Sequence, residues 1–292
     1  MLTAFFVVVR ILANPISNVF QKQLAERSAS PIFIIGSVHA CLALVCGPLW
    51  LFRATPVPYD VWLNMLAAAT LAVSGNTLLV YALRSTDLSI LGPVNAYKSV
   101  VGLILAIFLI GEYPSAAGMA GVLLIVAGSY VVVDRQVDQP AHNAFVLFFR
   151  ERGVQLRFAA LILAAAEAVF LKRAIVLSSP GTVFILWSIL GVPLAAVAFL
   201  ADRAPLARQL GTVRRFWTRY LALALTTGLM QSATVLTFGR LQVGYSLALF
   251  QLSTIVSVLL GHRYFQEKNI HKRLAGSIVM TAGAILIVAF GS

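Results

Sequence analysis

Ten apolar runs divide this chain, and each is about as long as a helix that crosses a lipid bilayer. A hydrocarbon layer of about 30 Å takes roughly 20 helical residues, whereas transmembrane strands are alternating segments of roughly ten residues. Because helices satisfy every backbone group within their own segment in lipid, we predict an all-α integral membrane protein. The expected spans cover residues 2–22, 31–52, 60–83, 88–110, 115–133, 157–177, 182–201, 217–239, 244–261 and 274–290.

Composition agrees with this class, because 60% of the 292 residues are hydrophobic and 11% are charged. The first run starts at Leu2 with no basic segment before it, so we expect it to remain as a helix and not to be cleaved as a signal peptide. Cys41 and Cys46 share one run, which argues against a disulfide or a thiolate metal site.

The longest polar connections are Asp134–Arg157 and Asp202–Phe216, and the second carries four arginines. We expect the first of them to separate two units. The predicted organisation is a five-helix repeat at residues 1–133, a connecting loop at 134–156 and a second five-helix repeat at 157–292.

Short sequence matches between the halves support a duplication. They are VFQK at 19–22 with VFLK at 169–172, Glu112 with Glu267, Gly121 with Gly276, and Gly128 with Gly283. Each unit holds an odd number of spans, so the second must enter the membrane from the opposite side, and we predict inverted repeats. Such repeats place a substrate site at their interface near the midplane and expose it by alternating access.

The matched positions themselves have a structural interpretation. The glycines are expected at helix contacts, where small residues permit close packing. The two glutamates precede the fifth and tenth spans, and a carboxylate there favours a helix N-terminus.

The fourth span carries Asn95 and Lys98 close to its middle. An unpaired ammonium in hydrocarbon costs at least ~2.5 kcal/mol, so an intramembrane lysine faces a cavity, a partner or a bundle interior. The alternative is a lysine whose stem reaches the membrane surface, which the apolar residues on both sides disfavour. We therefore predict that Lys98 points into a central site, with Asn95 beside it.

The first span carries a polar stripe of Arg10, Asn14, Asn18 and Gln21, whose spacing puts them on one helical face. Because burial of Arg10 is costly, we favour a cavity lining. The alternative is a set of hydrogen bonds between helices.

Glu167, at the centre of the sixth span, is the acid that lies deep inside a span and the natural partner of Lys98 or Arg10. Two interpretations stay open: a structural ion pair, or a group that binds a coupling proton or cation. Further candidate substrate contacts are Gln251, Tyr97 and Trp187, although amides and aromatic rings in membrane helices more often serve packing.

The loop acids and the glycine-containing helices after them recur in both halves. They occur in IGEY at 110–113 and FQEK at 265–268, followed by AGVLLIVAG at 120–128 and AGSIVMTAG at 275–283, with Pro93 in the fourth span. With the paired units, these motifs resemble the drug/metabolite transporter superfamily, in its ten-helix branch with two EamA-type repeats. The resemblance implies a secondary carrier of small metabolites, often an exporter of amino acids or related compounds.

The chain departs from that family pattern at two places. In the first span, Ala13-Asn14-Pro15 replaces the common Trp-Gly pair, and in the ninth, Phe250-Gln251 stands where a proline would answer Pro93. These departures concern the substrate more than the fold.

The formal net charge is +12, and 16 of the 22 lysines and arginines fall in the connections after the odd-numbered spans. By the positive-inside rule that face is cytoplasmic. We therefore expect a multi-pass protein of a bacterial inner membrane with both termini outside the cytoplasm, although the carriers that it resembles commonly have both termini inside. The excess charge indicates topology and affinity for anionic lipid, and not nucleic acid.

Function is predicted from the charges of the spans. Motifs for zinc hydrolysis, a nucleophilic serine, a phosphate-binding loop or a dithiol are absent, so we expect no enzyme, cofactor or metal. Lys98 and Arg10 outnumber Glu167, which favours a zwitterionic or carboxylate solute such as an amino acid. The predicted function is a secondary transporter, an exporter or exchanger acting as a monomer or homodimer; the alternative is a flippase for a lipid-linked or amphipathic molecule.

Overall fold

The computed structural model describes residues 2–27, 29–52, 56–85, 97–132, 151–202, 204–265 and 270–290. Nearly all of them are helical, and these ranges contain no strand. The all-α class is confirmed. Pro93, Asn95, Glu267 and most of the predicted 134–156 connection lie outside the described residues.

The helices of the first half follow the predicted spans closely. They are α1 (Leu2–Glu26), α2 (Pro31–Leu51), α3 (Tyr59–Ser85), α5 (Tyr97–Ile110) and α6 (Ala116–Val132). The helices of the second half are α8 (Arg152–Leu177), α9 (Pro180–Asp202), α10 (Leu206–Phe238), α11 (Val243–Phe250), α12 (Ser253–Phe265) and α13 (Ile270–Phe290). By length and composition, α1, α2, α3, α9 and α10 could each cross a membrane.

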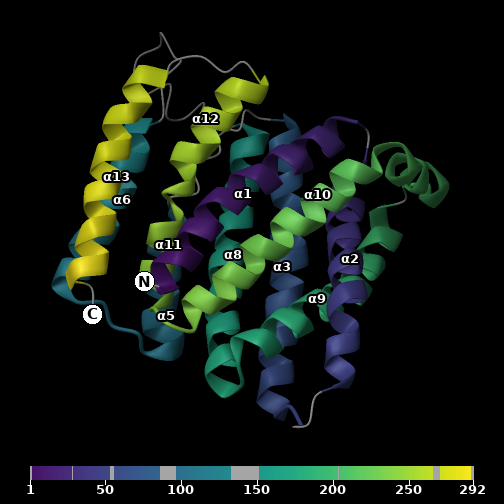
Figure 1. Ribbon diagram of the computed structural model, residues 1–292, viewed down its shortest axis with the longest axis horizontal. Coiled ribbons are helices and arrows are strands. Elements are labelled where there is room, and N and C mark those ends of the chain that lie inside the picture. The colour runs from purple at the N-terminus through teal and green to yellow at the C-terminus, as the bar shows by residue number, and fades with distance from the viewer. Residues whose placement is uncertain are drawn as a thin grey trace.

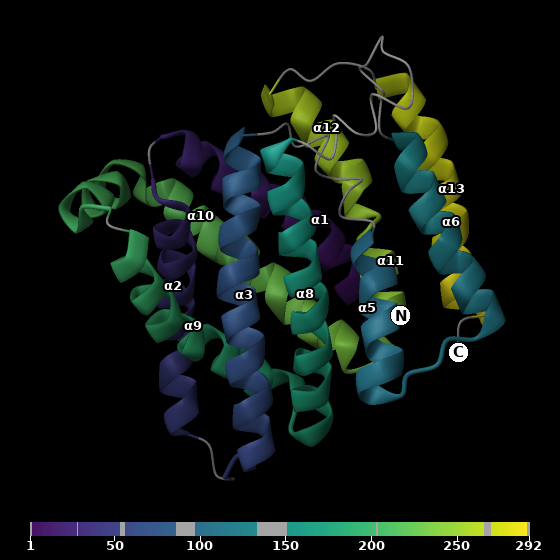
Figure 2. The same cartoon turned by 180° about the vertical axis from the view of Figure 1, so that it is seen from behind.

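The two halves pack against each other helix by helix (Figures 1 and 2). The largest pairs are α1 with α10, α2 with α9, α3 with α8, and α6 with α13, and α5 packs on both α11 and α8. Exchanging the corresponding helices of the two halves leaves the largest pairs unchanged, as a duplicated unit requires. The same pairs of helices would meet whether the symmetry axis that relates the halves lies in the membrane plane or along the membrane normal. The inverted orientation of the second repeat therefore stays a prediction.

The glycine pairs lie where the repeats predicted them, between α6 and α13. A methyl group at Gly121 would sit 2.8 Å from the carbonyl oxygen of Gly283, and one at Gly128 would sit 2.7 Å from that of Gly276. Such distances leave no room for a side chain, because the obstacle is backbone. The close approach holds these two helices together at one edge of the bundle (Figure 1).

The polar connection predicted at 202–216 is largely helical, because α10 already begins at Leu206. Its backbone leaves helical geometry at Phe216, with φ −123° and ψ 29°. The apolar span predicted at 217–239 follows this kink, and the arginine-rich segment before it forms a helix of its own.

The ninth span was predicted as continuous over 244–261, but it breaks between α11 and α12. The Gln251 side-chain amide donates to the carbonyl oxygen of Leu247 at 3.2 Å, which is the acceptor that its own backbone N–H would use in a regular helix. The Gln251 N–H bonds instead to Ala248 at 2.9 Å. The chain therefore tightens into a 3₁₀-type turn without any proline.

Glu112 was expected at the N-terminus of the fifth span, and this is wrong. Gly111 takes φ +67°, a left-handed conformation that ends α5 and turns the chain. The Glu112 carboxylate then accepts from the Val243 N–H at 2.6 Å, at the start of α11, and pairs with Lys172 at 3.4 Å. The Lys172 ammonium also donates to the carbonyl oxygens of Phe238 and Leu241, at 2.7 and 3.0 Å.

Replacing Lys172 with methionine should lower the melting temperature of the purified protein. The change removes one ion pair and two charged hydrogen bonds and leaves carbonyls at the end of α10 without a donor. Hydrogen bonds to charged groups contribute roughly 2 kcal/mol, so we expect a decrease of roughly 5 °C. Arg173→Met is the matched control, because Arg173 is adjacent but exposed. Equal melting temperatures for both variants would contradict the stabilising role of Lys172.

Candidate functional site

One cavity lies inside the bundle, lined by residues of both halves. It holds about 90 Å³, and one water molecule needs roughly 10–15 Å³ on the same measure. Helices α1, α2, α3 and α5 contribute from the first half, and α8 to α12 from the second. A small solute could therefore contact both halves at once, as alternating access requires.

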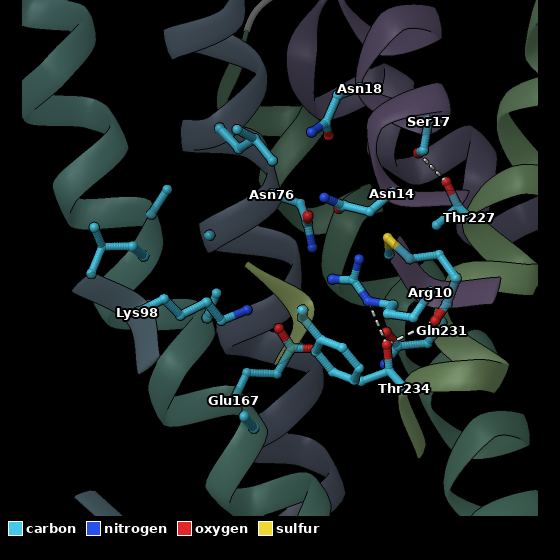
Figure 3. Close-up of a pocket in the computed structure, with 18 of the residues that line it drawn as sticks. Arg10, Asn14, Ser17, Asn18, Asn76, Lys98, Glu167, Thr227, Gln231 and Thr234 are labelled. Carbon is cyan, nitrogen blue, oxygen red and sulfur yellow. Dashed lines mark hydrogen bonds between the residues drawn. The ribbon is translucent and has the colours of Figure 1, made fainter. Parts of the chain in front are cut away.

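The polar stripe of α1 faces this cavity as predicted, with Arg10, Asn14, Asn18 and Gln21 all in its lining (Figure 3). The Arg10 guanidinium lies 5.0 Å from the ring centre of Phe250, and its Nε donates to Thr234 Oγ1 at 2.8 Å. These contacts fix the guanidinium plane while one edge stays toward the cavity.

Two predicted charges, Lys98 and Glu167, also line the cavity, and Figure 3 shows them on the side opposite Arg10 and Thr234. Glu167 interacts electrostatically with both Lys98 and Arg10. Lys98 and Glu167 do not come within the 4.0 Å of an ion pair; the ion pair found among the described residues is Glu112–Lys172. The carboxylate is held by the indole of Trp187, whose Nε1 donates to Glu167 Oε1 at 3.1 Å.

A third cation of the lining, Arg157, was missed. We had counted it with the loop arginines, but it lies inside α8, is 8% exposed and acts electrostatically on Lys98. The signal was available in its spacing, since Arg157, Ala164, Glu167 and Leu171 follow one face of a helix and all four line the cavity.

A second polar stripe, on α10, was also missed. Thr227, Gln231 and Thr234 line the cavity at spacings of four and three, opposite the stripe of α1. Ser17 of α1 shares a hydrogen bond of 2.8 Å with Thr227. The same spacing argument that identified the α1 stripe would have found this one.

Four buried side-chain atoms have no hydrogen-bond partner among the described residues, and all belong to residues of this cavity. They are Arg10 Nη1, Gln21 Oε1, His39 Nδ1 and Gln231 Nε2. A buried polar group without a partner costs about 1–3 kcal/mol, and such groups are rare in proteins. Their gathering around one space indicates a place built to hydrogen-bond something polar.

Of the other predicted substrate contacts, some line the cavity and some do not. Trp187 and Gln251 line the cavity, the first stacked on His39 with ring centres 4.3 Å apart. Tyr97 does not line it, because its ring packs on Phe158 at 5.5 Å in a separate apolar cluster. Asn95 lies outside the described residues. We therefore leave Tyr97 and Asn95 out of the argument below.

Comparison with known proteins assigns the first half. Residues 1–134 match the model of the EamA-like transporter family. These residues are therefore similar to the EamA-like transporter family. The resemblance to the drug/metabolite transporter superfamily is thereby confirmed, and together with the apolar helices it supports an integral, multi-pass membrane protein.

The fold of the EamA-like chain has counterparts among solved structures. A crystal structure with 15% sequence identity aligns over 99% of this chain and 97% of its own, with a TM-score of 0.70. At this identity the likeness shows the fold, and it extends across both halves. No curated protein sequence matches the chain.

Proposed function

We propose that this EamA-like transporter carries a small solute with a carboxylate, best an amino acid or a related zwitterion, through the cavity by alternating access. One observation carries the proposal: the four residues that have a partnerless buried polar atom all line this one space. Donor atoms of Arg10 and Gln231 and an acceptor of Gln21 suit a solute that has both kinds of group.

The charges favour an anionic group on the solute. Arg10, Lys98 and Arg157 line the cavity with one carboxylate, that of Glu167. At an effective dielectric near 20, opposite charges about 4 Å apart attract by ~4 kcal/mol before desolvation. A solute carboxylate placed between Arg10 and Lys98 would gain this attraction, and a solute ammonium would fit beside Glu167.

Uptake by proteoliposomes that contain the purified protein tests the proposal. Amino acids should be transported, and their carboxamide and decarboxylated amine analogues should not, because the analogues lack the group that Arg10 and Lys98 would bind. Equal uptake of an amino acid and its decarboxylated amine would contradict it. A flippase for an amphipathic molecule, the alternative, has no comparable support, because a space of about 90 Å³ is small for such a molecule.

The same site suggests how transport could be coupled to a proton or cation gradient. We propose that Glu167 either accepts a coupling proton or cation or neutralises the two neighbouring cations when the solute leaves. Glu167→Gln separates these possibilities: loss of gradient-driven uptake with retained solute exchange supports coupling, and loss of both supports the structural role.

The orientation proposed from charge is that both termini lie outside the cytoplasm, in a bacterial inner membrane. Arg157 and Lys22 are buried in the bundle and leave the count of face arginines and lysines, but the excess stays on the same face. A fluorescent protein that matures only in the cytoplasm, fused after Ser292, should then stay dark in cells. Bright fluorescence would reverse the orientation and leave the fold unchanged.

A further inference from the structure

Three arginines converge on one aromatic ring at the kink of α10. The guanidinium carbons of Arg27, Arg215 and Arg219 lie 4.7, 5.4 and 5.3 Å from the ring centre of Phe216. Arg27 comes from the C-terminal end of α1, and the other two flank the kink. Because Phe216 packs on the main apolar core, the ring fixes these cations relative to the bundle.

No carboxylate of the described residues pairs with these arginines. Glu26 is next to Arg27 in sequence and exposed, yet the ion pair found in the described ranges is Glu112–Lys172. Like charges gathered this closely repel each other, and stacking on an aromatic face offsets only about 0.5–1 kcal/mol each at exposed sites. The cluster therefore has the character of an anion-binding site.

The first segment of α10 places this cluster at an apolar–polar boundary. Leu206 and Leu210, four residues apart on one face, are 54% and 55% exposed, and Trp217 beyond the kink is 60% exposed. Arg208 and Arg214 are exposed among them. A helix that combines exposed leucines, an interfacial tryptophan and arginines lies at the surface of a membrane.

The opposite face of this segment is tied to the bundle. The Gln209 side chain is buried and accepts from the Ser30 N–H at 2.9 Å, and Thr212 shares a hydrogen bond of 2.9 Å with Tyr220. Figure 1 shows the segment projecting beside the end of α1, where Arg27 lies. The segment is thus held in place with its leucines and arginines outward.

We infer that Arg27, Arg215 and Arg219 around Phe216 form a binding site for the phosphate of an anionic lipid headgroup, with Leu206, Leu210 and Trp217 seated against the acyl chains. Guanidinium groups bind phosphate through paired hydrogen bonds, and each arginine near an anionic surface adds about 1 kcal/mol. This site is remote from the cavity and does not depend on what the cavity carries.

Thermal unfolding of the full-length protein in detergent, titrated with phosphatidylglycerol or with phosphatidylcholine of the same chains, tests the site. At a lipid concentration of 100 Kd the native protein should gain roughly 5 °C with phosphatidylglycerol and little with phosphatidylcholine. The triple variant R27Q/R215Q/R219Q should bind phosphatidylglycerol about a hundredfold more weakly. The matched control R152Q/R173Q/R263Q changes the same charge at exposed positions outside α1 and α10 and should respond as the native protein does.

Three results would overturn the lipid-binding site. A shift that survives in the R27Q/R215Q/R219Q variant, or that is lost equally in the control, would show that general surface charge attracts the lipid. An equal shift with inorganic phosphate alone would show a free-anion site instead of a lipid site. If the triple variant does not fold, R27K/R215K/R219K keeps the charge but loses planar stacking on Phe216; unchanged lipid affinity in that variant would also overturn the inference.

Discussion

Lys98→Ala is expected to reduce uptake of an amino acid by at least about a hundredfold while the protein stays folded. The ammonium lines the cavity and interacts with Glu167, Arg10 and Arg157. A charge pair is worth ~4 kcal/mol at about 4 Å before desolvation, and each 1.4 kcal/mol is about tenfold. Desolvation offsets part of this attraction. The loss of uptake stays large, because the solute carboxylate then interacts with Arg10 and no longer with Lys98.

Two comparisons make this result specific to recognition. Lys98→Ala should weaken the discrimination between an amino acid and its carboxamide, since one of the two cations proposed to bind the carboxylate is removed and Arg10 remains. Arg173→Ala removes the same kind of charge at an exposed position and should transport normally. Normal uptake by Lys98→Ala, with its melting temperature unchanged, would exclude Lys98 from solute binding.

Gly128→Leu is expected to prevent folding of the protein. A methyl group at this position already lies 2.7 Å from the Gly276 carbonyl oxygen and from the Met280 nitrogen, so a leucine must push α6 and α13 apart. Overpacking costs about 1–3 kcal/mol where side chains can move, and more here because the obstacle is backbone. We expect the yield of monodisperse protein to fall to background.

The control for this prediction is Gly47→Leu, near the C-terminal end of α2. A methyl group there meets nothing within 4 Å, so the variant should be purified at normal yield. Gly121→Leu, at the other close contact between α6 and α13, should behave as Gly128→Leu does. A folded Gly128→Leu protein would show that α6 and α13 can separate without loss of the bundle; its transport should then be unchanged, because neither helix lines the cavity.

Local patterns predicted most of the elements and one wall of the site. The α1 stripe, Lys98, Glu167, Trp187 and Gln251 all line the cavity as expected from their spacing or their charge within an apolar run. Arg157 was missed because it stands near the start of its span, where an arginine usually belongs to the membrane surface. Tyr97 was included because its aromatic ring could contact a substrate, yet it points about 100° away from its neighbour Lys98 in the helix.

The break after α11 shows a limit of another kind. Proline was the expected cause of a discontinuity, but here a glutamine side chain takes the acceptor of its own backbone N–H. Glutamine is a common helical residue, and nothing in its neighbours distinguishes Gln251 from one that points outward. The connection of Glu112 to α11, through Val243 and Lys172, likewise joins residues far apart in sequence.

Membrane class, most of the helices and the two similar halves followed from sequence alone, because hydrophobic length and periodicity are local properties that lipid imposes on each span separately. The cavity did not follow, since it requires the stripes of α1 and α10 and the charged face of α8 to meet. Which faces meet depends on packing between helices, and hence on contacts such as Gly121–Gly283. The missing hydrogen-bond partners of Arg10, Gln21, His39 and Gln231 can be recognised only in the folded structure, because they depend on which groups the surrounding helices bring close.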